Sequence, residues 1–167
     1  GKWKFALPAL SPGAHSLMAR AFDGDGKEMG AGEPWEFELP EIELPDLGPL
    51  YVRDLAGPPG APTVVLLHGW TATADLNWFT CYSHLAQHYR VVAYDHRGHG
   101  RGIRTRQTFR LEDCADDAVR VADALGIERF VPVGYSMGGA IAQLVWRQHR
   151  DRIDGLVLGA TAPYFAG

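Results

Sequence analysis

The chain has little cysteine, no long apolar run and no excess of positive charge, and each absence excludes a class of protein. Its two cysteines, Cys81 and Cys114, are far apart and form no metal-binding or redox motif. No stretch approaches the roughly 20 apolar residues that cross a bilayer. With 16 basic and 20 acidic side chains the net charge is −4. We therefore expect no nucleic acid and no membrane as a partner.

The N-terminus also lacks the apolar segment of a signal peptide, and the first residue is Gly1 rather than methionine. Such a start fits tag cleavage or a cut made in a longer protein. The cellular location therefore stays open, with the cytoplasm favoured for the second part of the chain. A length of 167 residues suffices for one ordinary domain, or for one domain with a small appendage.

Residues 1–39 show the period-2 alternation of β-strands. The turns SPG and GDGK separate three such runs, at 3–10, 14–23 and 34–39. The pattern predicts a three-strand antiparallel β segment. Its PGAHSLMARAFDGDGKE stretch resembles the last strands of bacterial immunoglobulin-like domains, although a complete sandwich of that kind has about seven strands.

The acidic stretch DGDGKE, residues 23–28, invites comparison with a calcium-binding loop. An EF-hand loop has an oxygen ligand at its fifth position and glycine at its sixth, where this sequence has Lys27 and Glu28. The stretch is therefore interpreted as a hairpin turn, and no metal site is expected.

The composition changes near Pro40, where the Pro-rich and acidic stretch ELPEIELPDLGP indicates a boundary between domains at 1–39 and 40–167. Beyond it, short apolar runs alternate with helical patterns. This alternation predicts an α/β fold with a mostly parallel sheet and helices on both faces. The expected strands are at 50–57, 63–69, 90–95, 129–136 and 153–161, and the expected helices at 75–89, 111–127 and 137–151.

Apolar side chains at helical spacing predict which faces of the helices are buried. In the helix at 75–89 these are Leu76, Phe79, Tyr82 and Leu85. The helix at 111–127 should end just before Gly126. Its expected buried residues are Ala115, Ala118, Val119, Ala122 and Leu125.

The stretch GYSMG, residues 134–138, matches the pattern G-x-S-x-G between an expected strand and an expected helix. In that context a serine sits in a strained turn, and small neighbours let the backbone turn tightly and expose the hydroxyl. The N-terminus of the following helix directs its dipole and its N–H groups at the serine oxygen. The alternative is a glycine-rich turn in which the serine only caps the helix.

Two further stretches, LLHGW at 66–70 and AYDHRGHGRG at 93–102, each end an apolar strand. With GYSMG they stand in the order typical of the α/β-hydrolase family, which residues 41–167 resemble. The resemblance implies that Ser136 is the nucleophile and that the backbone N–H groups of Trp70 and Met137 form the oxyanion hole. It implies a small-molecule carboxylic ester as substrate and no cofactor, while perhydrolases and C–C bond hydrolases share these motifs.

The other conspicuous side chains near these motifs are interpreted as structural. In the family a histidine at the position of His68 packs beneath the oxyanion loop. The order Ser…Asp/Glu…His also excludes His68, His96 and His99 as the catalytic base. Asp95 is expected to organise its loop, and Trp78 to pack on the sheet rather than line an acyl pocket.

Five arginines form a local basic run, but the sequence shows no aromatic interleaving there and no net positive charge. We therefore expect a solvated loop rather than a nucleic-acid footprint. The five are Arg97, Arg101, Arg104, Arg106 and Arg110.

The partners of a catalytic serine are not found after Ser136. The one later histidine, His149, stands near the far end of the following helix, about 20 Å away at 1.5 Å per residue. Asp151 and Asp154 precede the last expected strand, whereas active sites lie at the carboxyl ends of such strands. We therefore expect the N-terminal half of a hydrolase core, with residual or no activity as an isolated chain.

Several origins remain open for such a half-core. It is a fragment, or an engineered fusion of two partial domains, or a chain completed by self-association or by a second chain. The alternative function is a non-catalytic scaffold or interaction module. A carbohydrate-binding role for the first strands has only Trp3 and Trp35 in its favour, and both are expected to fill a core.

Overall fold

The computed structural model describes residues 13–17, 20–31, 35–39 and 41–163. By its internal contacts the chain divides into two compact units, Gly1–Pro40 and Glu41–Gly167. The first expected strand, at 3–10, lies outside the described residues.

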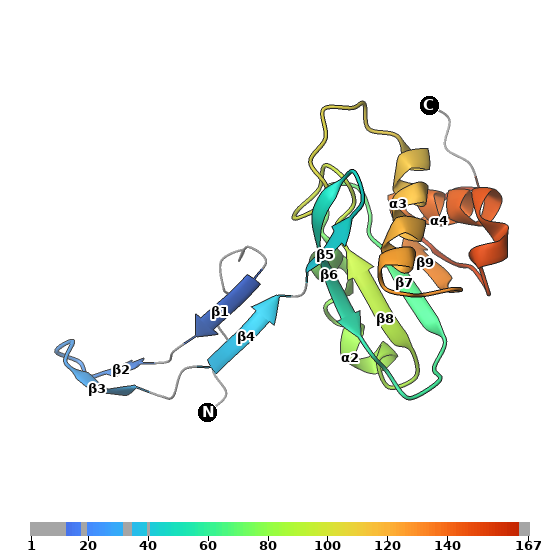
Figure 1. Cartoon of the computed structure of the whole chain (residues 1–167). Coiled ribbons are helices and arrows are strands. Elements are labelled where there is room, and N and C mark those ends of the chain that lie inside the picture. The colour runs from blue at the N-terminus through green and yellow to red at the C-terminus, as the bar shows by residue number, and fades with distance from the viewer. Residues whose placement is uncertain (1–12, 18–19, 32–34, 40, 164–167) are drawn as a thin grey trace. The chain divides into compact units, whose positions relative to one another are not determined.

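The first unit contains two pairs of antiparallel strands (Figure 1). Strand β1 (Gly13–Leu17) pairs with β4 (Trp35–Leu39), and β2 (Arg20–Phe22) pairs with β3 (Glu28–Ala31). The antiparallel character is confirmed, but the sequence did not indicate β3, which is short and exposed. The likeness to an immunoglobulin domain stays a prediction.

The acidic stretch between β2 and β3 forms the expected hairpin turn. Its ends are joined by a hydrogen bond of 2.9 Å from the Asp23 N–H to the Lys27 carbonyl. The Asp23 carboxylate accepts hydrogen bonds from the N–H groups of Asp25 (3.0 Å) and Lys27 (2.9 Å). The acidic side chain that suggested calcium therefore serves the turn itself.

The second unit is built on a six-stranded sheet with the order β10-β9-β7-β8-β6-β5. Its four strands from β10 to β8 are parallel, whereas β6 and β5 run antiparallel to their neighbours. A mostly parallel sheet was expected, and it is confirmed. The strands are β5 (Glu41–Leu44), β6 (Gly48–Leu55), β7 (Thr63–Leu67), β8 (Arg90–Tyr94), β9 (Val131–Tyr135) and β10 (Val157–Gly159).

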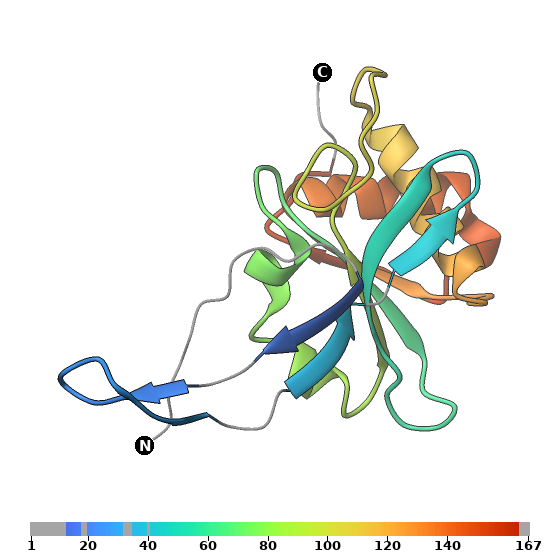
Figure 2. The same cartoon turned by 60° about the vertical axis from the view of Figure 1, so that its left-hand side comes forward.

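Helices cover both faces of this sheet, as the alternating pattern predicted (Figure 1 and Figure 2). Helices α3 (Leu111–Ala124) and α4 (Met137–Gln148) pack on one face, in the larger apolar core. The short α1 (Ala74–Trp78) and α2 (Tyr82–Leu85) pack on the other. A single 3-10 turn, η1 (Arg150–Arg152), follows α4.

The longest described helix, α3, has 14 residues, and none of the described helices combines the length and apolar character of a bilayer span. Four of the five residues expected to face inward in α3 are buried, whereas Leu125 is only partly buried. Gly126 stands just beyond the end of the helix at φ 65°. The residues that are fully buried there include Ala115, Ala118, Val121 and Ala122.

The single helix expected at 75–89 was wrong. The Thr73 side chain caps α1, the chain turns after Trp78, and a second helix restarts at Tyr82. The buried residues of the two helices are Ala74, which was not expected, and Tyr82, which was. Leu76 and Phe79, expected inside, are 65% and 67% exposed.

The expectation of a solvated arginine loop was wrong for two of its five members. Arg97 is 4% exposed and donates from Nε and Nη2 to the two carboxylate oxygens of Asp117, at 2.7 Å each. Arg101 lies over the Tyr51 ring at 3.7 Å from its centroid. The others, Arg104, Arg106 and Arg110, are exposed as expected.

We predict that Arg97→Ala strongly destabilises the second unit. Asp117 is 1% exposed, so its carboxylate would stay buried with only the half-exposed Arg120 as a partner. Removing one member of a buried ion pair costs about 3–5 kcal/mol of stability. Because Arg120 remains as a partner, we expect a loss of about 3 kcal/mol, at the lower end of this range. Urea unfolding followed by circular dichroism measures it. Arg106→Ala in the same loop is the control, and equal effects of the two variants would contradict the prediction.

Candidate active site

Ser136 stands at a sharp turn between strand β9 and helix α4. Its backbone has φ 53° and ψ −117°, outside the regions that ordinary L-residues occupy. The Ser136 N–H donates to the Gly159 carbonyl on neighbouring β10 at 2.9 Å, and the Ser136 carbonyl accepts from the Gly139 N–H at 2.9 Å. The adjacent strand and the helix thus hold the serine in this conformation.

The two glycines that flank the serine are required by close backbone contacts. A Cβ atom on Gly134 would lie 2.2 Å from the Gly138 carbonyl oxygen. A Cβ atom on Gly138 would lie 2.0 Å from the carbonyl oxygen of Leu67, at the end of β7. The pattern G-x-S-x-G therefore places glycine where helix α4 begins in direct contact with the ends of two strands and leaves no room for a side chain.

The structure brings the loop after β7 beside this turn. A Cβ atom on Gly69 would lie 3.3 Å from the Ser136 Cβ, so the Gly69–Trp70 segment passes next to the serine. On the other side, Met137 is the first residue of α4 and is buried. Its N–H belongs to the first turn, where N–H groups have no intrahelical partner and the helix dipole is positive.

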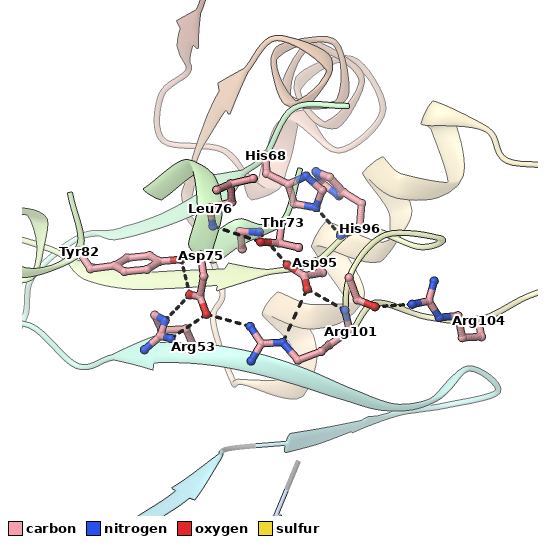
Figure 3. Close-up of polar contacts among 12 residues, drawn as sticks. Arg53, His68, Thr73, Asp75, Leu76, Tyr82, Asp95, His96, Arg101 and Arg104 are labelled. Carbon is pink, nitrogen blue, oxygen red and sulfur yellow. Dashed lines mark hydrogen bonds and ion pairs between the residues drawn. The ribbon is translucent and has the colours of Figure 1, made fainter. Parts of the chain in front are cut away.

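Side-chain hydrogen bonds hold Gly69 on both sides. Its N–H donates to Asn77 Oδ1 at 2.8 Å, and its carbonyl lies 2.8 Å from His68 Nδ1. The other ring nitrogen of His68, Nε2, accepts from the His96 backbone N–H at 2.9 Å (Figure 3). The loop then passes through Thr71 at φ 57° before α1 begins.

The start of α1 is held by one loop carboxylate. Asp95 accepts from the Ala74 N–H at 2.7 Å and from the Arg101 N–H at 2.8 Å, so one side chain joins the loops after β7 and β8 (Figure 3). Thr73 caps the same helix by accepting from the Leu76 N–H at 3.1 Å. Asp95 was expected to organise its loop, and these bonds confirm that role.

A second carboxylate, Asp75, joins these loops to the sheet (Figure 3). It accepts two hydrogen bonds from Arg53 on β6, at 2.8 and 3.0 Å, and one from Arg101 at 2.9 Å. Burial alone would raise the pKa of Asp75, but the bonds and charges of Arg53 and Arg101 lower it. The carboxylate is therefore ionised near neutral pH, and both arginines keep their partner.

His68 and His96 are buried and neutral. Their rings lie 4.4 Å apart between centroids, with exposures of 0% and 1%. Burial lowers the pKa of His68 below 6.5, and burial together with the two neighbouring imidazoles His68 and His99 lowers the pKa of His96 well below that value. Among the described residues, neither ring nitrogen of His96 has a hydrogen-bond partner.

The later titratable side chains lie where the sequence placed them, away from Ser136. His149 follows the C-terminal end of α4 and contacts Asp116 at 2.8 Å. Asp154 pairs with Arg129 on the surface. Within residues 41–163, no hydrogen bond joins the Ser136 hydroxyl to a histidine or a carboxylate.

Trp78 packs in the smaller apolar core, as expected. The role of Asn77 was not predicted. Helical periodicity emphasised the apolar neighbours of Asn77 and gave no reason to single out an amide. The Thr73 cap was detectable, because threonine followed two residues later by Asp75 is a typical helix start. The bond from Gly69 to Asn77 joins residues eight apart across a loop, which periodicity does not encode.

These features define a strand–serine–helix turn with the Gly69–Trp70 loop beside it. Residues 62–166 match the model of the alpha/beta hydrolase fold family, and the chain belongs to that family. The resemblance stated from the three sequence motifs is thereby confirmed.

Among its relatives is a bifunctional esterase/perhydrolase of Acinetobacter calcoaceticus, 36% identical over 109 residues, which are 64% of this chain and 39% of the relative. A non-heme haloperoxidase of Rhodococcus erythropolis is 34% identical over 128 residues, 75% of this chain and 45% of that protein. The enol-lactonase of Burkholderia xenovorans LB400 has a similar structure, with a TM-score of 0.68, 30% identity, and coverage of 74% and 47%. The chain thus spans less than half the length of these relatives.

We predict that the second unit loses stability as the pH falls below about 6.5. An unfolded histidine binds a proton near that pH, whereas the pKa values of folded His68 and His96 are lower. The unfolded state therefore binds more protons, and acid favours it by up to about 1.4 kcal/mol per pH unit for each histidine. Urea unfolding at pH 7.5 and pH 5.5 measures this loss. A flat profile between these pH values would contradict the prediction.

Proposed function

We propose that the second unit carries the nucleophile and the oxyanion hole of a serine hydrolase that acts on small carboxylic esters. The observation that carries this proposal is the strained conformation of Ser136, at φ 53°, beside the Gly69–Trp70 loop. Strained residues of this kind cluster at active sites. Hydrolysis as the general chemistry rests on the family itself.

The proposed reaction is an acyl transfer through a covalent intermediate. The Ser136 hydroxyl oxygen attacks the ester carbonyl carbon while a base takes its proton, and the carbonyl oxygen becomes an oxyanion. The N–H groups of Trp70 and Met137 would donate to that oxyanion, each stabilising the transition state by about 3–4 kcal/mol. The alkoxide leaves with a proton from the base, and water then attacks the acyl-serine in the same way.

The base in this proposal comes from outside the described residues. His68 has both ring nitrogens engaged, and His149 is bound to Asp116 beyond the end of α4. The histidine and acid would come from the part of the family's length that this chain does not span, from a second chain, or from another copy of this one. The edge strand β10 offers a place for it, because Val157 and Leu158 are 50% and 44% exposed there.

The ester as substrate class is supported by the relatives. One is an esterase/perhydrolase, and another is a pimeloyl-[acyl-carrier protein] methyl ester esterase of Photorhabdus laumondii. Both of these activities act on a carbonyl carbon, which fits a serine beside two backbone N–H donors. A non-catalytic scaffold is the second candidate, and it is favoured because no base contacts Ser136 within residues 41–163.

We predict that imidazole restores Ser136-dependent acylation in this chain. A serine with an oxyanion hole but no base reacts slowly, and dissolved imidazole can take the proton that a histidine would take. The chain is mixed with p-nitrophenyl acetate and increasing imidazole. Acetyl-serine on the peptide containing residue 136 is then measured by mass spectrometry. We expect its rate of formation to rise with imidazole concentration.

Ser136→Ala is the matched control, because imidazole and surface groups also cleave this ester. The difference between the two proteins reports the serine alone. If wild type and Ser136→Ala release nitrophenolate equally at every imidazole concentration, and no acetyl group is found on residue 136, the chain is a scaffold and the hydrolase proposal fails. Turnover at enzyme-like rates without imidazole would instead show that the chain holds its own base.

A further inference from the structure

We propose that His68 is a positioning residue for the oxyanion hole: as the neutral Nδ1–H tautomer it sets the orientation of the peptide group that carries the Trp70 N–H. The proposal rests on the proposed function. It adds a tautomeric state and a specific hydrogen bond to what was expected of His68, which was packing beneath the loop.

The first step of the argument is the peptide group that His68 contacts. Its Nδ1 atom lies 2.8 Å from the Gly69 carbonyl oxygen. That carbonyl belongs to the same planar peptide unit as the Trp70 N–H. In a trans peptide the C=O and N–H bonds point in opposite directions, and the described chain has no cis peptide. A donor that fixes the Gly69 carbonyl therefore fixes the direction of the Trp70 N–H, away from the imidazole.

The second step is the tautomer, which the other ring nitrogen determines. The His96 backbone N–H donates to His68 Nε2 at 2.9 Å, so Nε2 must carry a lone pair. A neutral imidazole with an acceptor at Nε2 has its proton on Nδ1, where it faces the Gly69 oxygen. The backbone of the loop after β8 thus selects the one protonation state that can hold the oxyanion loop.

The third step concerns what surrounds the ring. His68 is fully buried, with the His96 ring at 4.4 Å and the His99 ring at 5.3 Å between centroids. Asp95 is the nearby carboxylate, and both its oxygens accept backbone N–H groups while Arg101 lies within 3.8 Å. A buried hydrogen bond between fixed groups polarises the peptide it contacts. A polarised Gly69 carbonyl makes the Trp70 N–H a stronger donor for the oxyanion.

Asn77 complements His68 from the other side of Gly69. Its Oδ1 atom accepts the Gly69 N–H at 2.8 Å, so this donor is engaged within the protein. The next N–H of the loop is that of Trp70, which the proposal assigns to the oxyanion. His68 and Asn77, which lie on different elements, thus hold the two peptide groups on either side of Gly69. Glycine has no side chain that could hold them by its own packing.

The tautomer is tested directly by ¹⁵N NMR of the imidazoles in the full chain at pH 7.5. Long-range ¹H–¹⁵N correlations distinguish a protonated from an unprotonated ring nitrogen. We expect His68 to show a protonated Nδ1 and an unprotonated Nε2. A protonated Nε2 at this pH would overturn the proposal, whatever the activity of the chain.

Two variants separate the two hydrogen bonds of His68. The amide nitrogen of His68→Asn lies near the place of Nδ1 and keeps a donor for the Gly69 carbonyl, but it loses the bond to His96. The longer His68→Gln reaches the place of Nε2 and keeps a partner for the His96 N–H, but it loses the donor to Gly69. Both variants bury one amide, so they are matched in polarity.

In the imidazole-assisted acylation of Ser136, we expect His68→Asn to stay within about threefold of wild type. We expect His68→Gln to slow by about 10²-fold, the lower end of the loss on removing one oxyanion-hole donor. If His68 contributed only to stability, the two variants would acylate Ser136 at equal rates once the rates are corrected for the fraction of folded protein. Equal rates, or the reverse order, would overturn the proposal.

The Trp70 backbone amide gives a second readout that needs no activity. Its ¹H–¹⁵N resonance should move in His68→Gln and stay close to the wild-type position in His68→Asn. If wild type fails to acylate Ser136 but the ring nitrogens and the Trp70 amide behave as expected, the hydrolase proposal fails and the positioning role stands. If acylation occurs but the Trp70 amide moves equally in both variants, the positioning role fails and the hydrolase proposal stands.

Discussion

The close approach of three backbone segments at Ser136 is the constraint on which the second unit depends. The end of β7, the end of β9 and the start of α4 meet at distances that leave no room for a Cβ atom on Gly134 or Gly138. A serine at positive φ is unfavourable by about 1–3 kcal/mol on its own. Here the Gly159 carbonyl and the first turn of α4 engage its peptide groups. The turn is thus maintained by the sheet and the helix, whose packing in the larger core supplies the compensating free energy.

Charged side chains hold the two loops that the close backbone contacts at Ser136 do not order. The loops after β7 and β8 contain few large apolar residues, and their ordering relies on Asp75, Asp95 and the arginines around them. The ions are partly or fully withdrawn from water, so each one is matched by a partner of opposite charge or by backbone N–H groups. Arg97 with Asp117 fastens the same loop to α3. Within this basic run, Arg97 and Arg101 pair with carboxylates of other elements, whereas the remaining three arginines are exposed.

Most of the fold and the family could be predicted from sequence because they depend on local patterns. Apolar runs marked the parallel strands, and GYSMG required a turn whose glycines the backbone contacts explain. The failures concern contacts between distant segments. Nothing near Arg97 in sequence indicates Asp117, and helical spacing through Phe79 gave no warning that the chain would turn after Trp78. The bonds of Gly69 to His68 and Asn77 likewise depend on where the loop turns, which composition does not record.

Asp95 accepts one hydrogen bond from the first residue of α1 and another from Arg101. Two loops that leave neighbouring strands therefore share a single anchoring carboxylate. Losing this one carboxylate would therefore release the start of α1 and the loop after β8 together.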